Sequence, residues 1–283
     1  MPGFQRRPLA LAVMLAVTAP PLAHAQVNAD VTLPAVNVES QREGGLITES
    51  TRSATRTDTP LRDIPQTINV VPQELIRAQN TTSLADALRN VPGITLTAPE
   101  GGTQNQQNFW LRGFPASGDL FLDSVRDVGE YNRYLFAIES VEVLKGPSAL
   151  MFGRGSTGGV INQVSKLPYL GTGTEVGLTL GSYEQRRATV DSNWTVGERS
   201  ALRINAMAED SDSFRDTVEV KKFGIAPTLR MGIGTDTDIT LSYYYLKDHT
   251  PTEYGQPTLG AAGNYALPPV SVRDYFGLAK YDF

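Results

Sequence analysis

The chain has 283 residues, with 25 Lys or Arg against 30 Asp or Glu, so its formal net charge is −5. Hydrophobic residues make up 40% and charged residues 19%, which provides material for a folded core and is unlike a disordered chain. The acidic balance argues against a basic nucleic-acid-binding protein. Without cysteine there are no disulfides, thiolate metal sites or cysteine nucleophiles, and two histidines cannot form a metal centre on their own.

The first 25 residues have the parts of a secretory signal peptide. Arg6 and Arg7 supply the positive start, residues 9–19 form an apolar run, and Ala23-His24-Ala25 is a small-x-small cleavage site. We therefore expect residues 1–25 to be an export signal rather than a short buried helix. No later segment approaches the roughly 18–20 consecutive apolar residues of a membrane helix. Any membrane contact of the mature chain must then use the strands of a closed barrel.

Residues 26–57 are polar, rich in Thr and Ser, and without a sustained hydrophobic period, which predicts a flexible arm. Within the arm, Val36 and Val38 alternate with polar neighbours. Such a short alternation in a linker usually carries no function. Its functional interpretation is a strand that pairs with the sheet edge of a partner.

Residues 58–168 predict a small α+β domain. Its first strand is expected over 64–71, and Pro72 then opens a short helix, because proline suits a first helical position. Ser83 caps a second helix, with Asp86 three residues later in a capping-box arrangement. The second helix is expected over 84–90, and further strands over 108–112, 120–125, 140–144 and 160–164.

From about Thr174 the pattern changes to long strands in which apolar and polar residues alternate strictly. Each is roughly 9–12 residues long, which exceeds the usual strand and matches the tilted span of a membrane strand. The links 196–199 and 232–238 suit periplasmic turns, and 249–269 suits an extracellular loop. A sixth strand is expected near Val272. The alternative is a soluble sandwich with one wet face.

Gly153, Gly155 and Gly158 match the letters of the dinucleotide-binding fingerprint G-x-G-x-x-G. That chemistry needs a strand before the glycines and a helix after them. Here a helical turn over 148–152 precedes them and the β-branched pair Val160-Ile161 follows, so the context is reversed. We expect a tight turn between packed elements. No nucleophile–base–carboxylate set is recoverable either, so we assign no catalytic residue and no enzymatic activity.

Five segments together resemble a known family. They are residues 61–70 (LRDIPQTINV), 84–93 (LADALRNVPG), 111–114 (LRGF), 141–148 (VEVLKGPS) and 152–166 (FGRGSTGGVINQVSK). In this order and spacing the chain resembles the TonB-dependent outer-membrane receptors, and within them the siderophore receptors. The resemblance is greatest to ferric-catecholate receptors.

The resemblance implies a plug domain over 58–168 inside a large barrel whose first antiparallel strands occupy 169–283. A plugged barrel of this kind has about 22 strands, far more than residues 169–283 can supply at roughly 10 residues per strand plus loops. We therefore expect an N-terminal fragment, with an incomplete transmembrane β-barrel that does not transport alone. Two alternatives stay open. An exported plug-like module would bind a ferric siderophore without transport, and an exported hydrolase would lose activity on mutation of His249.

The resemblance also implies partners and a location. The receptor would lie in the outer membrane of a Gram-negative bacterium, contact its lipid, capture a ferric siderophore and draw energy from TonB with the ExbB–ExbD complex; no nucleic acid is involved. Iron arrives bound to the siderophore, so neither a cofactor nor a metal ligand of the protein is expected. The short alternation in the arm becomes the expected TonB box, formed by Leu33, Pro34, Ala35, Val36, Asn37, Val38 and Glu39.

Ligand contacts are expected on the plug loops over 99–108, 115–118 and 128–134. Because ferric siderophores are often anionic, arginine, aromatic and amide side chains suit this role. The candidates are Gln104, Gln107, Tyr131, Arg133 and Tyr134. Arg112, in the LRGF segment, resembles the plug arginine of the family that pairs with carboxylates of the barrel wall. Its alternative is a solvated arginine at a strand end.

Overall fold

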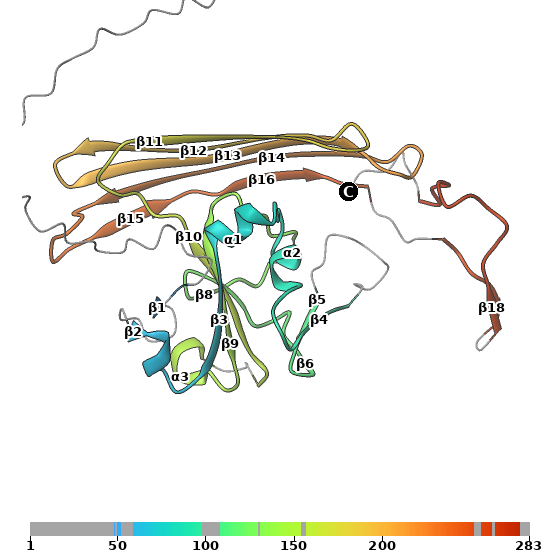
Figure 1. Ribbon diagram of the computed structural model, residues 1–283, viewed down its shortest axis with the longest axis horizontal. Coiled ribbons are helices and arrows are strands. Elements are labelled where there is room, and N and C mark those ends of the chain that lie inside the picture. The colour runs from blue at the N-terminus through green and yellow to red at the C-terminus, as the bar shows by residue number, and fades with distance from the viewer. Residues whose placement is uncertain are drawn as a thin grey trace, which may run out of the picture. The chain divides into compact units, whose positions relative to one another are not determined.

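The computed structural model describes residues 48, 50–51, 59–97, 108–129, 131–153, 157–251, 256–261 and 264–277. The expected signal peptide, the expected TonB box, and both Gln104 and Gln107 lie outside these described residues. Two assemblies follow one another along the described chain. We call residues 59–166 the plug and the strands of 173–249 the wall. Figure 1 shows the wall as one layer of long strands beside the plug elements α1 and β10.

The plug is an α+β domain, as predicted. Its main sheet has the order β3 (Thr67–Pro72), β9 (Ile138–Lys145), β10 (Gly159–Ser165), β7 (Leu120–Leu122) and β8 (Val125–Arg126). Strands β10 and β7 are parallel, and the other neighbours are antiparallel. A smaller sheet joins β4 (Ile94–Thr97), β5 (Asn108–Leu111) and β6 (Phe114–Pro115). The remaining short elements are β1 (Ser50–Thr51), β2 (Thr59–Pro60), the 3-10 helix η1 (Leu61–Asp63) and α3 (Ala149–Phe152).

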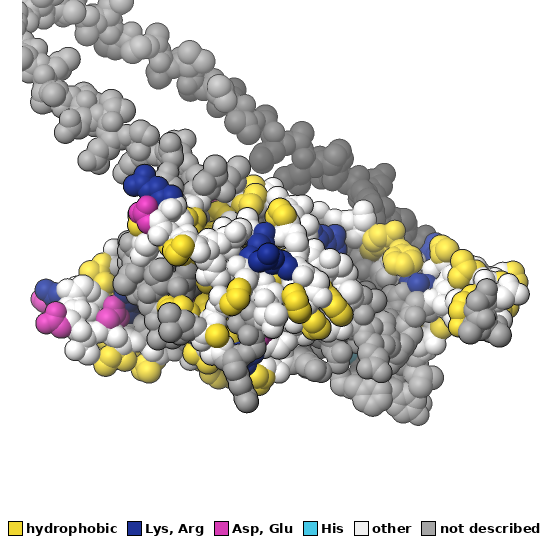
Figure 2. Space-filling model, turned by 90° about the horizontal axis from the view of Figure 1, so that it is seen from below, with side chains coloured by type: hydrophobic (Ala, Val, Ile, Leu, Met, Phe, Trp, Pro, Cys, Tyr) yellow, Lys and Arg dark blue, Asp and Glu magenta, His cyan; other side chains and the backbone are white. Residues whose placement is uncertain are grey.

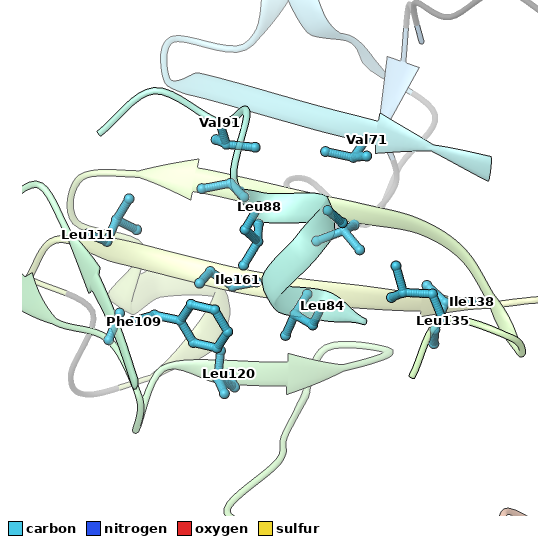
Figure 3. Packing of buried hydrophobic residues seen from close by; sticks show 14 of the residues in the cluster. Val71, Leu84, Leu88, Val91, Phe109, Leu111, Leu120, Leu135, Ile138 and Ile161 are labelled. Carbon is cyan, nitrogen blue, oxygen red and sulfur yellow. The ribbon is translucent and has the colours of Figure 1, made fainter. Parts of the chain in front are cut away.

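Two helices complete the plug, α1 (Gln73–Ala78) and α2 (Leu84–Leu88). The predicted N-cap at Ser83 is confirmed, because its hydroxyl accepts from the Asp86 amide at 3.2 Å. The Asp86 carboxylate accepts from the Ser83 hydroxyl at 2.8 Å, which differs from the reciprocal backbone bond of a capping box. Leu84 and Leu88 are fully buried and point toward the sheet (Figure 3). Burial of each leucine contributes about 1.5–3 kcal/mol. The core therefore lies between α2 and the plug strands.

The expected plug strands are present with shifted ends, and one of them is split. Asp123 and Ser124 both adopt positive φ, at 50° and 67°, so the strand predicted over 120–125 turns back on itself after Leu122. The Asp123 carboxylate supports this turn by accepting from the Ser165 amide at 2.8 Å. Asp123 therefore bonds this turn to the end of β10.

The elements on either side of the glycine motif are those that its context predicts, whereas the expected tight turn over 154–156 lies outside the described residues. Helix α3 precedes it and strand β10 follows, which is the reverse of a dinucleotide-binding turn. A Cβ on Gly158 would lie 2.2 Å from the Leu111 carbonyl oxygen, and one on Gly159 would lie 2.1 Å from that of Leu144. Gly159 also has φ +137°. Only glycine fits this close approach of backbones.

The wall is antiparallel throughout. Strands β11 (Gly173–Leu180), β12 (Arg186–Gly197), β13 (Ser200–Asp212) and β14 (Glu219–Met231) are 8, 12, 13 and 13 residues long. Strands β15 (Ile239–Ser242) and β16 (Tyr245–His249) both pair with β14. The alternating pattern from Ile239 to Tyr245 predicts one strand here, and the structure interrupts it at Tyr243-Tyr244. The strand expected to begin near Val272 is not found in the described residues up to 277, where residues 272 and 273 form a turn. A hairpin, β17 (Leu259–Ala261) with β18 (Asn264–Ala266), stands instead within the expected loop.

The predicted alternation separates the two faces of the wall. Val176, Leu178 and Leu180 on β11 are 62%, 78% and 83% exposed. The opposite face turns polar residues toward the plug, and these are buried, Asn193 and Asn205 each to 1% exposure. Seen from below, hydrophobic side chains lie in several groups over the described surface (Figure 2). In the described part of the chain, no helix has the length and apolar character needed to cross a membrane.

Candidate functional site

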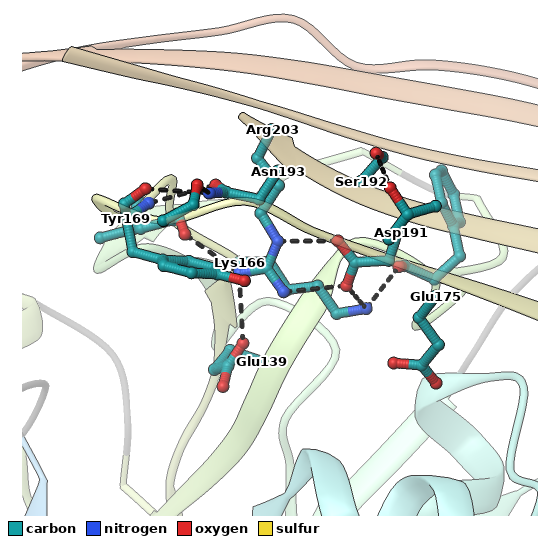
Figure 4. Close-up of polar contacts among 12 residues, drawn as sticks. Glu139, Lys166, Tyr169, Glu175, Asp191, Ser192, Asn193 and Arg203 are labelled. Atoms are coloured by element: carbon teal, nitrogen blue, oxygen red, sulfur yellow. Dashed lines mark hydrogen bonds and ion pairs between the residues drawn. The ribbon is translucent and has the colours of Figure 1, made fainter. Parts of the chain in front are cut away.

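The plug and the wall meet at a buried ionic cluster. Lys166 follows the last plug strand and is 7% exposed; its ammonium group donates to the Phe136 carbonyl at 3.1 Å and lies 3.0 Å from the Asp191 carboxylate of β12. Arg203 of β13 donates two hydrogen bonds of 2.8 Å to the same carboxylate (Figure 4). Burial lowers the pKa of Lys166, and the charge of Asp191 opposes that shift. Asp191 thus joins one cation of the plug to one of the wall.

Further contacts surround this cluster. Arg77 of α1 pairs with Glu175 of β11 at 2.5 Å, and between α1 and the first wall strands lies a cleft of about 220 Å³. Asn193 fixes the chain that links plug to wall: its amide donates to the carbonyls of Tyr169 and Gly171 at 2.9 and 2.7 Å. The linker is therefore bonded directly to β12.

An apolar contact lies beside the ionic one. A Cβ on Gly224 of β14 would lie 2.8 Å from two ring carbons of Phe136, so the absence of a side chain there lets the plug ring approach the wall backbone. The Phe136 ring stacks on that of Tyr244 with centroids 5.6 Å apart. Met207, Ala226 and Leu246 complete the contact from the wall side.

Three of the predicted ligand residues come together in what we call the apical segment, comprising Asp127, Gly129 and residues 131–134. Arg133 is 4% exposed, and its guanidinium donates to the Asp127 carboxylate at 2.9 Å and to the Gly129 carbonyl at 2.6 Å. It also lies over the Tyr131 ring at 4.5 Å. Arg133 therefore cross-links the segment in this structure, and its contact with a ligand stays a prediction.

The aromatic residues of the segment line a cavity of about 140 Å³ between plug and wall. Tyr131 donates to the Asp127 carboxylate and Tyr134 to that of Asp248, both at 2.7 Å. Tyr243 and Tyr244, where β15 gives way to β16, line the same cavity. Sequence reasoning missed these two wall tyrosines, although three consecutive tyrosines within an alternating strand were a visible signal.

Arg112 sits apart from this interface. It has φ +54°, its amide donates to the Gly93 carbonyl at 2.8 Å, and its side chain lies against Gly93 and Gly146. The structure shows no ion pair of Arg112 within the described residues, so its pairing with wall carboxylates stays a prediction. The described residues also contain no group of three or more His, Cys, Asp or Glu arranged to hold a metal ion.

Replacing Asp191 by Asn tests the ionic cluster. The change leaves Lys166 and Arg203 facing each other without a shared anion, and removing one partner of a buried ion pair costs about 3–5 kcal/mol. We expect the free energy of unfolding, measured by denaturant titration of the purified protein, to fall by about 3 kcal/mol. Asp238→Asn is the control, because Asp238 lies in the link between β14 and β15 and forms an exposed ion pair with Arg230. Equal effects of the two variants would contradict the assignment.

Tyr131 should titrate abnormally. Burial, followed by the hydrogen bond to Asp127, raises its pKa from 10.0 to about 12. The stability that the neutral phenol contributes is therefore complete below pH 10 and is lost as the pH rises through about 12. In a spectroscopic titration, the phenolate signal that Tyr131→Phe removes should appear near pH 12. A transition of that signal at the ordinary tyrosine pKa would show that the phenol is not held by Asp127.

Known proteins are similar to this chain in sequence and in structure. Residues 60–160 match the model of the TonB-dependent receptor plug domain. The chain is 38% identical over 256 residues to the probable TonB-dependent receptor BfrD of Bordetella pertussis, a match that covers 89% of this chain and 34% of BfrD. It is 34% identical over 249 residues to the catecholate siderophore receptor Fiu of Escherichia coli K12, covering 87% of this chain and 32% of Fiu.

The solved structure of the siderophore receptor PiuA from Acinetobacter baumannii extends the likeness beyond the plug. It matches with a TM-score of 0.72 at 34% identity, over 81% of this chain and 33% of PiuA. The chain thus spans about a third of the length of the relatives it matches. Residues 60–160 thus resemble the plug domain of TonB-dependent receptors, and plug and wall strands together are similar to the N-terminal third of these siderophore receptors.

Proposed function

We propose that these residues are the plug and the first barrel strands of an outer-membrane receptor that imports ferric siderophores with energy from TonB and the ExbB–ExbD complex. The observation that carries the proposal is the division of the wall into an apolar face and a buried polar face whose charges pair with the plug. In this proposal residues 1–25 are the signal peptide, 26–57 the arm, 58–168 the plug and 169–283 the beginning of the barrel.

The apolar face of the wall suits contact with lipid. Its strands of 12 and 13 residues cover the roughly 9–11 residues that a tilted strand needs to cross a bilayer. Within the described residues, β11 is paired on one side and the sheet stays open. An open edge in lipid leaves backbone groups unsatisfied at several kcal/mol each. We therefore propose that the 283 residues do not transport by themselves.

The apical segment and its tyrosine-lined cavity are the proposed place of ligand contact. Tyr131 and Tyr134 approach Tyr243 and Tyr244 there, which offers aromatic faces to a chelate. Arg133 would supply a cation to an anionic chelate by leaving the Asp127 carboxylate. We keep Gln104 and Gln107, which lie outside the described residues, as candidate contacts. The siderophore brings the ligands of its own iron, so we assign the protein no resident cofactor, no metal ligand and no catalytic residue.

The arm is the proposed site of energy coupling. The segment Leu33–Glu39 would pair as a strand with the sheet edge of TonB, and main-chain hydrogen bonds would carry most of the affinity. A proline in this segment removes a backbone donor that such pairing needs, whereas another β-branched residue keeps it. We further propose that Arg112 pairs with wall carboxylates beyond the described strands.

Iron uptake tests this function. The gene is deleted in the bacterium that encodes it, and uptake of radioactive iron as the ferric tris-catecholate complex is measured under iron limitation. We expect the deletion to abolish uptake of iron from this complex. Reintroducing the intact natural gene should restore it. A gene carrying Val36→Pro should restore binding of the complex to cells but no uptake, whereas Val36→Thr should restore both.

The outcomes separate the competing functions. Binding without uptake by the natural gene would favour a ligand-binding module. If the deletion left the uptake of every ferric siderophore unchanged, the receptor assignment would be wrong. If Val36→Pro supported normal uptake, energy coupling would not run through strand pairing at this segment.

A further inference from the structure

Four inward-facing charged residues lie side by side across four neighbouring wall strands. The register places Arg187 of β12 opposite Glu209 of β13, Glu209 opposite Lys222 of β14, and Lys222 opposite Asp248 of β16. Their charges alternate, and directly opposed pairs of opposite charge stabilise a sheet. Glu209 lies 3.0 Å from Arg187 and 3.2 Å from Lys222, and all three side chains are largely buried. We call these four residues the charge ladder.

Asp248 ends the ladder and turns toward the plug. One of its carboxylate oxygens accepts from the Tyr134 hydroxyl at 2.7 Å and from the Asn132 amide at 3.3 Å. The other accepts from the hydroxyl of Thr250 at 2.6 Å. Lys222, its neighbour in the ladder, lies 4.9 Å from the centre of the Tyr134 ring. The last two members of the ladder thus contact the same plug tyrosine.

The apical segment that they hold is bonded within itself. Arg133 donates to the backbone carbonyls of Asp127, Gly129 and Tyr131, and to the Asp127 carboxylate, which also accepts from the Tyr131 hydroxyl. These bonds close the segment without using the wall. The end of the segment is also bonded to the chain that leads into α2, because the Leu84 amide donates to the Arg133 carbonyl at 2.8 Å and the Leu135 amide to the Thr82 carbonyl at 2.9 Å. These two amides therefore report whether the segment leaves its place as one unit.

We propose that Asp248 is a positioning residue that fixes the apical segment to the wall, and that the segment moves as one unit when its bonds to Asp248 break. The proposal rests on the proposed function only in taking this segment to face the ligand. Hydrogen bonds to a carboxylate are stronger than those between neutral groups, so Asp248 can hold this side of the segment against the wall. Burial and the charge of Asp248 both raise the pKa of Tyr134, which keeps its hydroxyl protonated as a donor.

Hydrogen exchange of the ligand-free protein, isolated from the outer membrane in detergent, tests this attachment. The variants are Asp248→Ala, Tyr134→Phe and their combination, with Asp238→Ala as a control for loss of a wall carboxylate elsewhere. We expect Asp248→Ala to speed exchange of the Leu84 and Leu135 amides by roughly tenfold or more, since hydrogen bonds to a charged group are lost. The factor should be the same for both amides, because the segment opens as a unit.

The combined variant separates attachment from general loosening. If Asp248 acts through Tyr134, the double variant should exchange no faster than Asp248→Ala alone, because Tyr134→Phe removes a bond that Asp248→Ala has already removed. Additive effects, unequal factors for the Leu84 and Leu135 amides, or unchanged exchange would overturn the proposal. If Asp248→Ala loosens the whole plug, Tyr134→Phe decides: faster exchange confined to these two amides supports the proposal, and unchanged exchange overturns it. Because no ligand is present, these outcomes are independent of the uptake experiment.

Discussion

The pairing of buried charges constrains this structure more than any other interaction. The inner face of the wall carries Arg187, Asp191, Arg203, Glu209 and Lys222, each largely removed from water. A buried charge is costly unless a partner of opposite sign and further hydrogen bonds surround it. The ladder supplies partners within the wall, whereas Asp191 shares its carboxylate with Lys166 of the plug. Charges of the plug and of the wall therefore pair with each other across the interface. Neither of the two facing surfaces is suited to contact with lipid.

Packing and polarity agree at this interface. Gly224 admits the Phe136 ring to the wall backbone next to the ionic cluster, and Asn193 fixes the linker between the two assemblies. At a third point on the same face, Asp248 accepts a hydrogen bond from the Tyr134 hydroxyl. Contacts of different chemistry thus attach the plug at separate points. Such an arrangement allows one attachment, at the apical segment, to open while the others persist.

Much of this architecture was predictable because it depends on local pattern. Three features are visible within a dozen residues each. They are the helix cap at Ser83, the reversed context of the glycine motif and the period of the wall strands. The charge ladder was not, because it depends on the register between strands as far apart as Arg187 and Asp248. Nor could the sequence show that Arg133 binds its own loop, since an arginine near aromatic residues fits ligand contact equally well.

The central claim is that one face of the wall meets lipid and the other meets the plug. Nitroxide labels on single introduced cysteines along β11 and β12 test it most directly, with accessibility to oxygen and to a water-soluble nickel complex measured in membranes. Labels at Leu178 and Val190 should be accessible to oxygen, and one at Asn193 protected from both reagents. Accessibility that does not alternate along the strands, or labels at Leu178 and Val190 that meet only the aqueous reagent, would contradict the account.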